Sequence, residues 1–302
     1  MVWPVNLSGL CQAFPRSWRP LETGFLPVGR AEKSYPVLLE QGHENRVIVS
    51  VKVEMEKRSF MGNQEQLKLL KDGVGTWNAW RKANPSIRID LSGGNLSGMD
   101  LPEVDLDGAN LHDVNFKNSN LSGSILSGAN LTESSLMEAN LTGANLKNAN
   151  VNDADLLNVT LVRANLERAH LAKTDMTGAD ISEANLTEAN LHLANLHNAK
   201  FKRANLEGTK LREANMVRVD LAGANLESAD LAQSNLKQAN VSGANVENAS
   251  LIQADLQDAD LRELHNMTLI QLSKARSMRH ARLDPPVEEQ LAKDYPHLFR
   301  QN

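Results

Sequence analysis

The sequence predicts an all-β solenoid, a chain wound into stacked coils around a narrow apolar core. Three observations support this prediction. A large apolar residue recurs at every fifth position from Leu91 to Leu261, over 35 consecutive pentads without a change of phase. A small residue, most often Ala, stands two positions before it, and Asn or Asp usually stands one position before it. Helices and strands have side-chain periods of 3.6 and 2, so a period of five requires a different fold.

A corner at every pentad closes a four-sided coil after four pentads. The large and small apolar side chains then point inward, while the Asn or Asp and the two variable positions point outward. Successive coils pair as parallel β-structure about 4.8 Å apart, which gives nearly nine coils and a rod roughly 40 Å long. The small residue is needed because a close-packed interior cannot hold two large side chains per pentad. We expect Asn and Asp at the corners, where they bond to local backbone.

The repeat Ala-Asn/Asp-Leu-x-x over residues 88–262 closely resembles the pentapeptide-repeat family. This resemblance implies a right-handed quadrilateral parallel β-helix. The segment Trp77-Asn78-Ala79-Trp80-Arg81 is similar to a helix that precedes the repeats in bacterial members, and it implies an α-helical cap. Some members mimic duplex DNA and protect or inhibit DNA gyrase.

The N-terminal part divides in two. Residues 1–60 lack the five-residue period, and their composition favours a disordered extension or a start placed too far upstream, with one candidate strand at Val47–Val53. Residues 61–87 are expected to form the N-terminal cap.

Within this cap we expect a helix over residues 64–83, ended by Pro85. Asn63 is its N-cap and Gln66 completes a capping box. The helix covers the open end of the first coil, because a bare end exposes apolar core and an unpaired strand edge. The alternative is that Trp77 and Trp80 bind a partner.

Residues 263–302 are expected to form the C-terminal cap and tail. Thr268 can N-cap a short helix, and Ala281-Arg282-Leu283 echoes one further pentad out of phase. Pro285 and Pro286 then break the chain before a last helix from Val287 to Tyr295. In some relatives a C-terminal helix forms a dimer, which is a second interpretation of the same residues.

Composition argues against several classes of protein. Cys11 is the only cysteine, so no intrachain disulfide framework is expected. The sequence shows no apolar run long enough for a membrane span and no signal peptide, and a cytoplasmic location is the default. The histidines lack metal-ligand spacing, and no catalytic arrangement or cofactor motif is present. We therefore expect a protein that is not an enzyme and needs no cofactor or metal.

Residues 20 apart should stack in columns on the rod. Arg163, Glu183 and Arg203 alternate in charge in one such column, as expected of a structural ladder. Other columns carry like charges, which either relax into solvent or attract a cationic partner. The candidate recognition surface comprises one acidic column with its neighbour, a second acidic column and a basic patch: Asp113, Glu133, Asp153 and Glu138; Glu207, Glu227 and Glu247; Lys200, Lys202 and Arg203.

The preferred functional hypothesis is a rigid, non-catalytic scaffold for an unknown protein partner. The alternative is a DNA-mimicking regulator or protector of DNA gyrase, since residues 91–260 carry 23 acidic and 12 basic side chains. The basic patch disfavours that alternative, because a mimic of the phosphate backbone should be free of it. Nucleic-acid binding through the patch is not favoured either, because acidic residues interrupt it.

Overall fold

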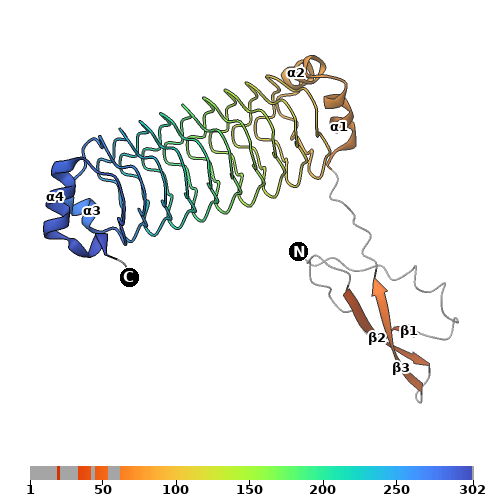
Figure 1. The fold of residues 1–302 in the computed structure, drawn as a ribbon. Helices are drawn as coiled ribbons and strands as arrows, with labels where there is room; N and C mark the ends of the chain where they lie inside the picture. The colour runs from red at the N-terminus through yellow and green to blue at the C-terminus, as the bar shows by residue number, and fades with distance from the viewer. Residues whose placement is uncertain (1–18, 21–32, 42–44, 54–61, 301–302) are drawn as a thin grey trace. The chain divides into compact units, whose positions relative to one another are not determined.

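The computed structural model describes residues 19–20, 33–41, 45–53 and 62–300 and divides the chain into two compact units, Met1–Ser59 and Phe60–Asn302. The first unit contains an antiparallel sheet of strands β1 (Arg19–Pro20), β2 (Lys33–Gln41) and β3 (Asn45–Val53) in the order β1-β2-β3 (Figure 1). The strand expected at Val47–Val53 lies within β3. Apart from these three strands, residues 1–60, for which disorder is expected, lie outside the described residues.

The second unit is a rod of stacked coils between two groups of helices (Figure 1). Residues 20 apart form single parallel β-bridges, beginning with Asp90 and Asn110 and continuing along four sides of the coil to Asn245 and His265. Each pentad therefore contributes one bridged residue, the Asn or Asp position. A buried large residue follows it, then a two-residue turn and a buried small residue.

Main-chain hydrogen bonds connect each coil to both neighbours. Leu161 N–H donates to the Asp180 carbonyl of the next coil at 2.7 Å, and Asn165 N–H donates to the Ala144 carbonyl of the preceding coil at 2.9 Å. A bond from Ala164 N–H to the Leu161 carbonyl, 3.0 Å long, closes the turn. This repeated pattern provides hydrogen-bond partners for the main-chain N–H and C=O groups of successive coils.

The corners lie at the two variable positions, not at the Asn or Asp. The second variable residue adopts a left-handed conformation, with φ of 58° at Arg163 and 60° at Leu193. The predicted corner position of Asn and Asp was therefore wrong. Their predicted bonding to local backbone is observed, since Asn165 Oδ1 accepts from Glu167 N–H at 3.1 Å. The main chain of Asn165 forms a β-bridge, so only its side chain takes part in the turn, through this hydrogen bond.

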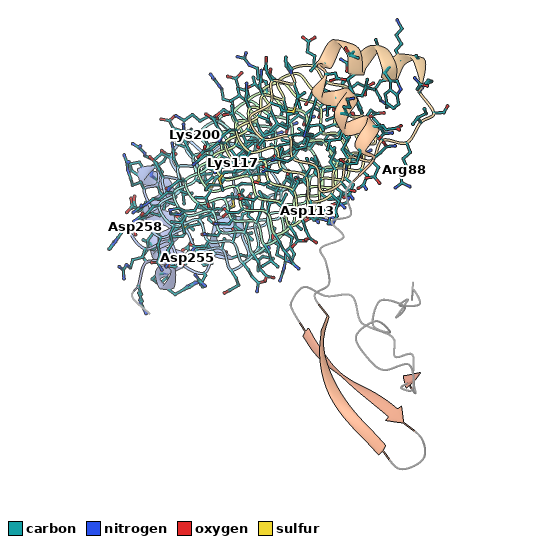
Figure 2. The ribbon with its side chains drawn as sticks, turned by 90° about the vertical axis from the view of Figure 1, so that its right-hand side faces the viewer. Arg88, Asp113, Lys117, Lys200, Asp255 and Asp258 are labelled. Carbon is teal, nitrogen blue, oxygen red and sulfur yellow. The ribbon has the colours of Figure 1, made fainter. Side chains whose placement is uncertain are left out.

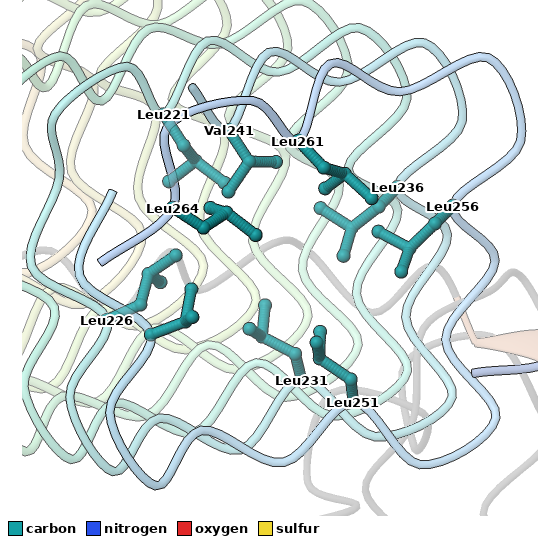
Figure 3. Close-up of a pocket in the computed structure, with 10 residues that line it drawn as sticks. Leu221, Leu226, Leu231, Leu236, Val241, Leu251, Leu256, Leu261 and Leu264 are labelled. Carbon is teal, nitrogen blue, oxygen red and sulfur yellow. The ribbon is translucent and has the colours of Figure 1, made fainter. Parts of the chain in front are cut away.

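The interior is filled by the large and small residues of the repeat. Phe116 and Phe201, the aromatic residues of the series, are fully buried. Figure 3 shows the leucine side chains of the last coils, from Leu221 to Leu264, which enclose a gap of only about 10 Å³. Such a core is close-packed and has no room for a substrate inside the rod.

The N-terminal segment forms two helices, α1 (Gln64–Lys71) and α2 (Val74–Ala83). The single helix expected over residues 64–83 was wrong because Gly73, with φ of 120°, interrupts it and begins α2. Asn63 is the N-cap of α1, as predicted, and its side chain accepts from the N–H groups of Glu65 and Gln66. Gln66 does not complete a capping box with Asn63.

Side-chain amides of these helices instead bond to the exposed edge of the first coil. The Gln66 amide donates to the Arg88 carbonyl at 3.0 Å and accepts from Asp90 N–H at 2.9 Å. Asn78 accepts from Asp105 N–H at 3.0 Å in the same manner. Trp77 is fully buried, and its Nε1–H donates to the Asp105 carbonyl at 2.7 Å. This burial disfavours the alternative in which Trp77 binds a partner.

The C-terminal segment forms α3 (Leu269–Ser273), α4 (Pro285–Asp294) and a 3₁₀ helix, η2 (Pro296–Phe299). Thr268 is the N-cap of α3, as predicted, and forms a capping box with Gln271. Pro285 and Pro286 begin α4 instead of breaking the chain, since the first helical turn needs no N–H partner.

Two further pentads lie between α3 and α4. They form the parallel bridges of Asp255 with Ser277 and of Asp260 with Arg282. The separation of 22 residues, instead of 20, arises because α3 occupies part of the tenth coil. The predicted out-of-phase pentad at residues 281–283 is one of the two.

Candidate recognition surfaces

Columns of alternating charge form ion-pair ladders along the rod. Glu183 accepts from Arg163 Nε and from Arg203 Nη2, each at 2.8 Å, so one carboxylate joins three coils. Arg168 pairs with Glu188 at 2.7 Å. The hydrogen bond from Arg163 lowers the pKa of Glu183. These columns stabilise neighbouring coils, as the stacking rule predicts, although exposed pairs contribute only about 0–1 kcal/mol each.

An amide ladder is present on another side. Asn165 donates to Asn145 at 3.4 Å and Asn245 donates to Asn225 at 2.9 Å. The ladder changes partner at Asn205, whose amide donates to the hydroxyl of Thr187. This side therefore presents a regular polar surface next to the column that contains Glu207.

The predicted basic patch is neutralised by carboxylates. Lys200 lies 3.7 Å from Asp180, Lys202 lies 3.1 Å from Asp220, and Arg203 pairs with Glu183. Figure 2 shows Lys200 on the surface of the rod. The three cations thus lie near one another, but each belongs to an ion pair, so the patch does not present three free positive charges.

The first acidic column lies along one corner of the rod. Asp113, Glu133 and Asp153 are exposed and have φ of 56°, 58° and 59°, so each occupies the second turn position of successive coils (Figure 2 labels Asp113). Glu138 occupies the same position at the next corner, with φ of 57°. The structure brings the three column residues into register and leaves Glu138 on the adjoining side.

The second acidic column comprises Glu207, Glu227 and Glu247, each in the first turn position. Their N–H groups donate to the asparagine two residues earlier, each at 3.2 Å. Among the described residues no Lys, Arg or His lies within ion-pair distance of these three carboxylates. Two column positions before Glu207, Glu167 pairs with Lys147 at 2.8 Å. The column therefore changes from paired to unpaired charge toward the C-terminal end.

Sequence reasoning missed an ionic cluster at the C-terminal end. The Asp255 side chain is 1% exposed and contacts Lys237 at 3.3 Å and also Arg276. Asp260 pairs with Arg262 at 2.6 Å, and the hydrogen bond from Arg262 lowers the pKa of Asp260. A spacing of 22 residues, instead of 20, aligns Asp255 and Asp260 with the pentads that follow α3. The sequence does not reveal this spacing, because it depends on α3.

A groove of about 560 Å³ lies beside this end of the rod and was also missed. Coil residues 247–252 line one wall, and residues 266–268, Gln271 and Lys274 line the other. The sequence gives no signal for it, because the groove exists only where α3 departs from the pentad path.

Two absences characterise the described part of the chain. No group of three or more His, Cys, Asp or Glu side chains there has a geometry suited to a metal ion. None of its helices has the length and apolar character that crossing a membrane requires.

Comparisons with known proteins agree with the geometry. The model for pentapeptide repeats (8 copies) matches residues 87–123, 189–227, 199–238 and 229–263, and the model for a pentapeptide repeat region matches residues 109–186. Together these matches span more than half of the chain. No curated protein matches the sequence.

The chain is similar to several solved structures. HetL, a pentapeptide repeat protein involved in heterocyst differentiation regulation from the cyanobacterium Nostoc sp. strain PCC 7120, is 27% identical with a TM-score of 0.53; the match covers 68% of this chain and 92% of HetL. QnrB1, a plasmid-mediated fluoroquinolone resistance protein, is 15% identical with a TM-score of 0.49, over 72% of this chain and 100% of the QnrB1 chain. The bridged five-residue coils and the family matches lead to one conclusion: the chain belongs to the pentapeptide repeat family.

Proposed function

We propose that this protein is a rigid, non-catalytic scaffold, a right-handed β-helix whose outer faces bind another protein. The observation that supports this most directly is the separation of core from surface. Most inward positions are occupied by apolar side chains, with Ser or Thr at a few of the small ones, while nearly all the variable positions lie on the outside. Recognition residues can therefore vary without disturbing the core, and long flat faces suit a macromolecular partner.

We further propose that helices cap both ends of the solenoid, at residues 61–87 and 263–302, around repeats at residues 88–262. The support is the bonding of side-chain amides to coil edges. Gln66 bonds to the first coil, and Gln271 Nε2 donates to the Val246 and Ala249 carbonyls at 2.8 and 3.0 Å. Covered ends oppose end-to-end aggregation of the rods. We propose a cytoplasmic location for such a scaffold.

The DNA-mimic alternative, with DNA gyrase as partner, is less favoured. A mimic should present phosphate-like negative charge continuously, whereas the ladder of Arg163, Glu183 and Arg203 alternates in sign. Nucleic-acid binding is also disfavoured, because Lys200 and Lys202 are engaged with carboxylates. A supercoiling assay with purified gyrase separates the alternative: unchanged gyrase activity at micromolar protein eliminates it.

A dimer through the C-terminal helix is less favoured than a monomer. Leu291 of α4 and Leu298 of η2 are fully buried within the same chain. These two apolar side chains are therefore already covered and are not open to a helix-mediated dimer.

The scaffold proposal is tested by capturing partners from the host with the immobilised full chain. A triple variant, E207K/E227K/E247K, reverses the unpaired column, and D113K/E133K/D153K reverses the other column with the same change in charge. We expect one saturable partner to be lost with one variant and kept with the other. Equal capture by all three proteins, or no saturable partner, would refute recognition through an acidic face.

A further inference from the structure

The ladder of bridges has a gap at the C-terminal end. On one side of the rod the bridges run through Asp230 and Ser250 and then stop, while two other sides continue to Ser277 and Arg282. The position above Ser250 would belong to Ile270, but Ile270 lies in α3. One rung of the tenth coil is therefore missing, and the groove of about 560 Å³ lies there.

The missing rung leaves two main-chain donors without acceptors. In the preceding coil each of these two donors has an acceptor in the next coil. Leu231 N–H donates to the Ser250 carbonyl at 2.9 Å, and Ser228 N–H donates to the Glu247 carbonyl at 2.7 Å. The equivalent groups, Leu251 N–H and Asn248 N–H, have no acceptor among the described residues. Both residues line the groove, and Leu251 is only 5% exposed.

The carbonyl group between these two donors does have a hydrogen-bond partner. The Ala249 carbonyl accepts from Gln271 Nε2, so the structure satisfies the acceptor and leaves the donors. The groove thus offers N–H groups at the spacing of a parallel ladder. This arrangement suits the carbonyl groups of an added extended segment, as in β-strand addition.

The charged groups at the ends of the groove differ in sign. Glu247, the last residue of the unpaired acidic column, lines one end. Lys274, whose carbonyl accepts from Gln253 N–H at 2.8 Å, marks the other. Between them Ile252 is 48% exposed and Met267 is partly buried, which provides an apolar contact for one side chain.

We propose that this groove binds an extended peptide segment of the partner protein as the missing rung. The segment runs parallel to residues 248–252, because the bridges of the rod are parallel. It carries Lys or Arg at its N-terminal end, beside Glu247, and Asp or Glu at its C-terminal end, beside Lys274. This proposal rests on the scaffold function and names the chemistry of its partner.

The test is a selection from a displayed library of random peptides against the immobilised full chain. We expect enriched peptides to place a basic residue about four to five positions before an acidic one, the span of a single rung. Their affinity should fall about tenfold with the charge-exchanged variant E247K/K274E. Peptides with the order of charges reversed should regain binding to that variant. R168E/E188R, which exchanges the charges of an ion pair on a complete part of the ladder, should bind as wild type.

Hydrogen exchange then identifies the main-chain contacts. The bound peptide should slow exchange of the Asn248 and Leu251 amides. The proposal is overturned if no peptide is enriched or if enriched peptides bind E247K/K274E with unchanged affinity. It is also overturned if the Asn248 and Leu251 amides exchange as fast with peptide bound as they do without it. In each of those cases the scaffold function still stands if a host partner is captured by one of the triple variants E207K/E227K/E247K and D113K/E133K/D153K and lost with the other.

Discussion

Asp255 offers the sharpest test of how the C-terminal cap is attached. Its carboxylate is almost fully buried between the ninth coil and the added pentads, where it contacts Lys237 and Arg276. It also accepts from Gln257 N–H at 3.2 Å. The change Asp255→Asn keeps the volume and the acceptor for Gln257 and removes the charge. It therefore isolates the ionic contribution.

The expected loss follows from the exposure of the partners. Removing one member of a fully buried pair costs roughly 3–5 kcal/mol, because a charge is left without a partner. Here the Lys237 and Arg276 side chains are 41% and 54% exposed and can return to water. The remaining loss is that of charged hydrogen bonds, each about 1.5–3 kcal/mol before solvent screening. We expect a total of about 2 kcal/mol, which would appear as local opening of residues 274–300.

Native-state hydrogen exchange measures this opening directly. The Arg276 amide, which donates to the Ala254 carbonyl at 2.8 Å, should exchange about thirtyfold faster in Asp255→Asn. Asp258→Asn is the matched control, since Asp258 lies on the same coil, is 45% exposed and, within the described part of the chain, forms an ion pair only with His280. The control should change protection by less than about 0.5 kcal/mol. Equal protection in wild type and Asp255→Asn would refute the reasoning.

Three further predictions concern the rod. Ser119 and Ser124 bury hydroxyl groups that have no hydrogen-bond partner among the described residues, so Ser→Ala at each should raise the free energy of unfolding by about 1 kcal/mol in chemical denaturation. Gly62→Ala should destabilise the first coil by about 1–3 kcal/mol in the same assay, because an added Cβ would lie 2.5 Å from a carbonyl oxygen; a neutral result would contradict the close approach. The pKa of Glu183 is lowered by Arg163, so its contribution is complete above the ordinary pKa of 4.5 and is lost as pH falls through the lowered value. The difference in Tm between wild type and Glu183→Gln should therefore be larger at about pH 7 than at about pH 3, and a constant difference would exclude this linkage.

The repeat allowed much of the surface to be predicted from sequence. Because four pentads complete a coil, Arg163 and Glu183 had to lie one above the other, and they form an ion pair. The same rule placed Glu207, Glu227 and Glu247 in one column. It failed to locate the corners, because periodicity identifies which residues are equivalent and says nothing about φ. The positive φ values at residues such as Arg163 are imposed by the ladder, against the local preference of the residue.

The ends of the rod were harder to predict for a physical reason. There the pentad pattern stops, and unique contacts decide the path. The sequence predicts Gln66 in a capping box, yet its amide bonds to the coil edge, where unpaired backbone groups would otherwise remain. The shift of two residues at Ser277 depends on the length of α3, which a period of five cannot specify. The groove arises from the same shift and was therefore invisible in the sequence.

The stacked four-sided coil places residues 20 apart in columns, and a distance measurement along one column tests this arrangement most directly. Asn118, Asn198 and Gln238 share one corner, with φ of 57°, 57° and 58°. Spin labels at cysteines placed there, with Cys11 changed to Ser, should give Asn118–Asn198 and Asn118–Gln238 distances near 19 and 29 Å, about 4.8 Å for each coil. Because the label environments are equivalent, the difference of about 10 Å is the decisive quantity. Equal distances, or a distance that does not grow with the number of coils, would contradict the stacked four-sided coil and every column built on it.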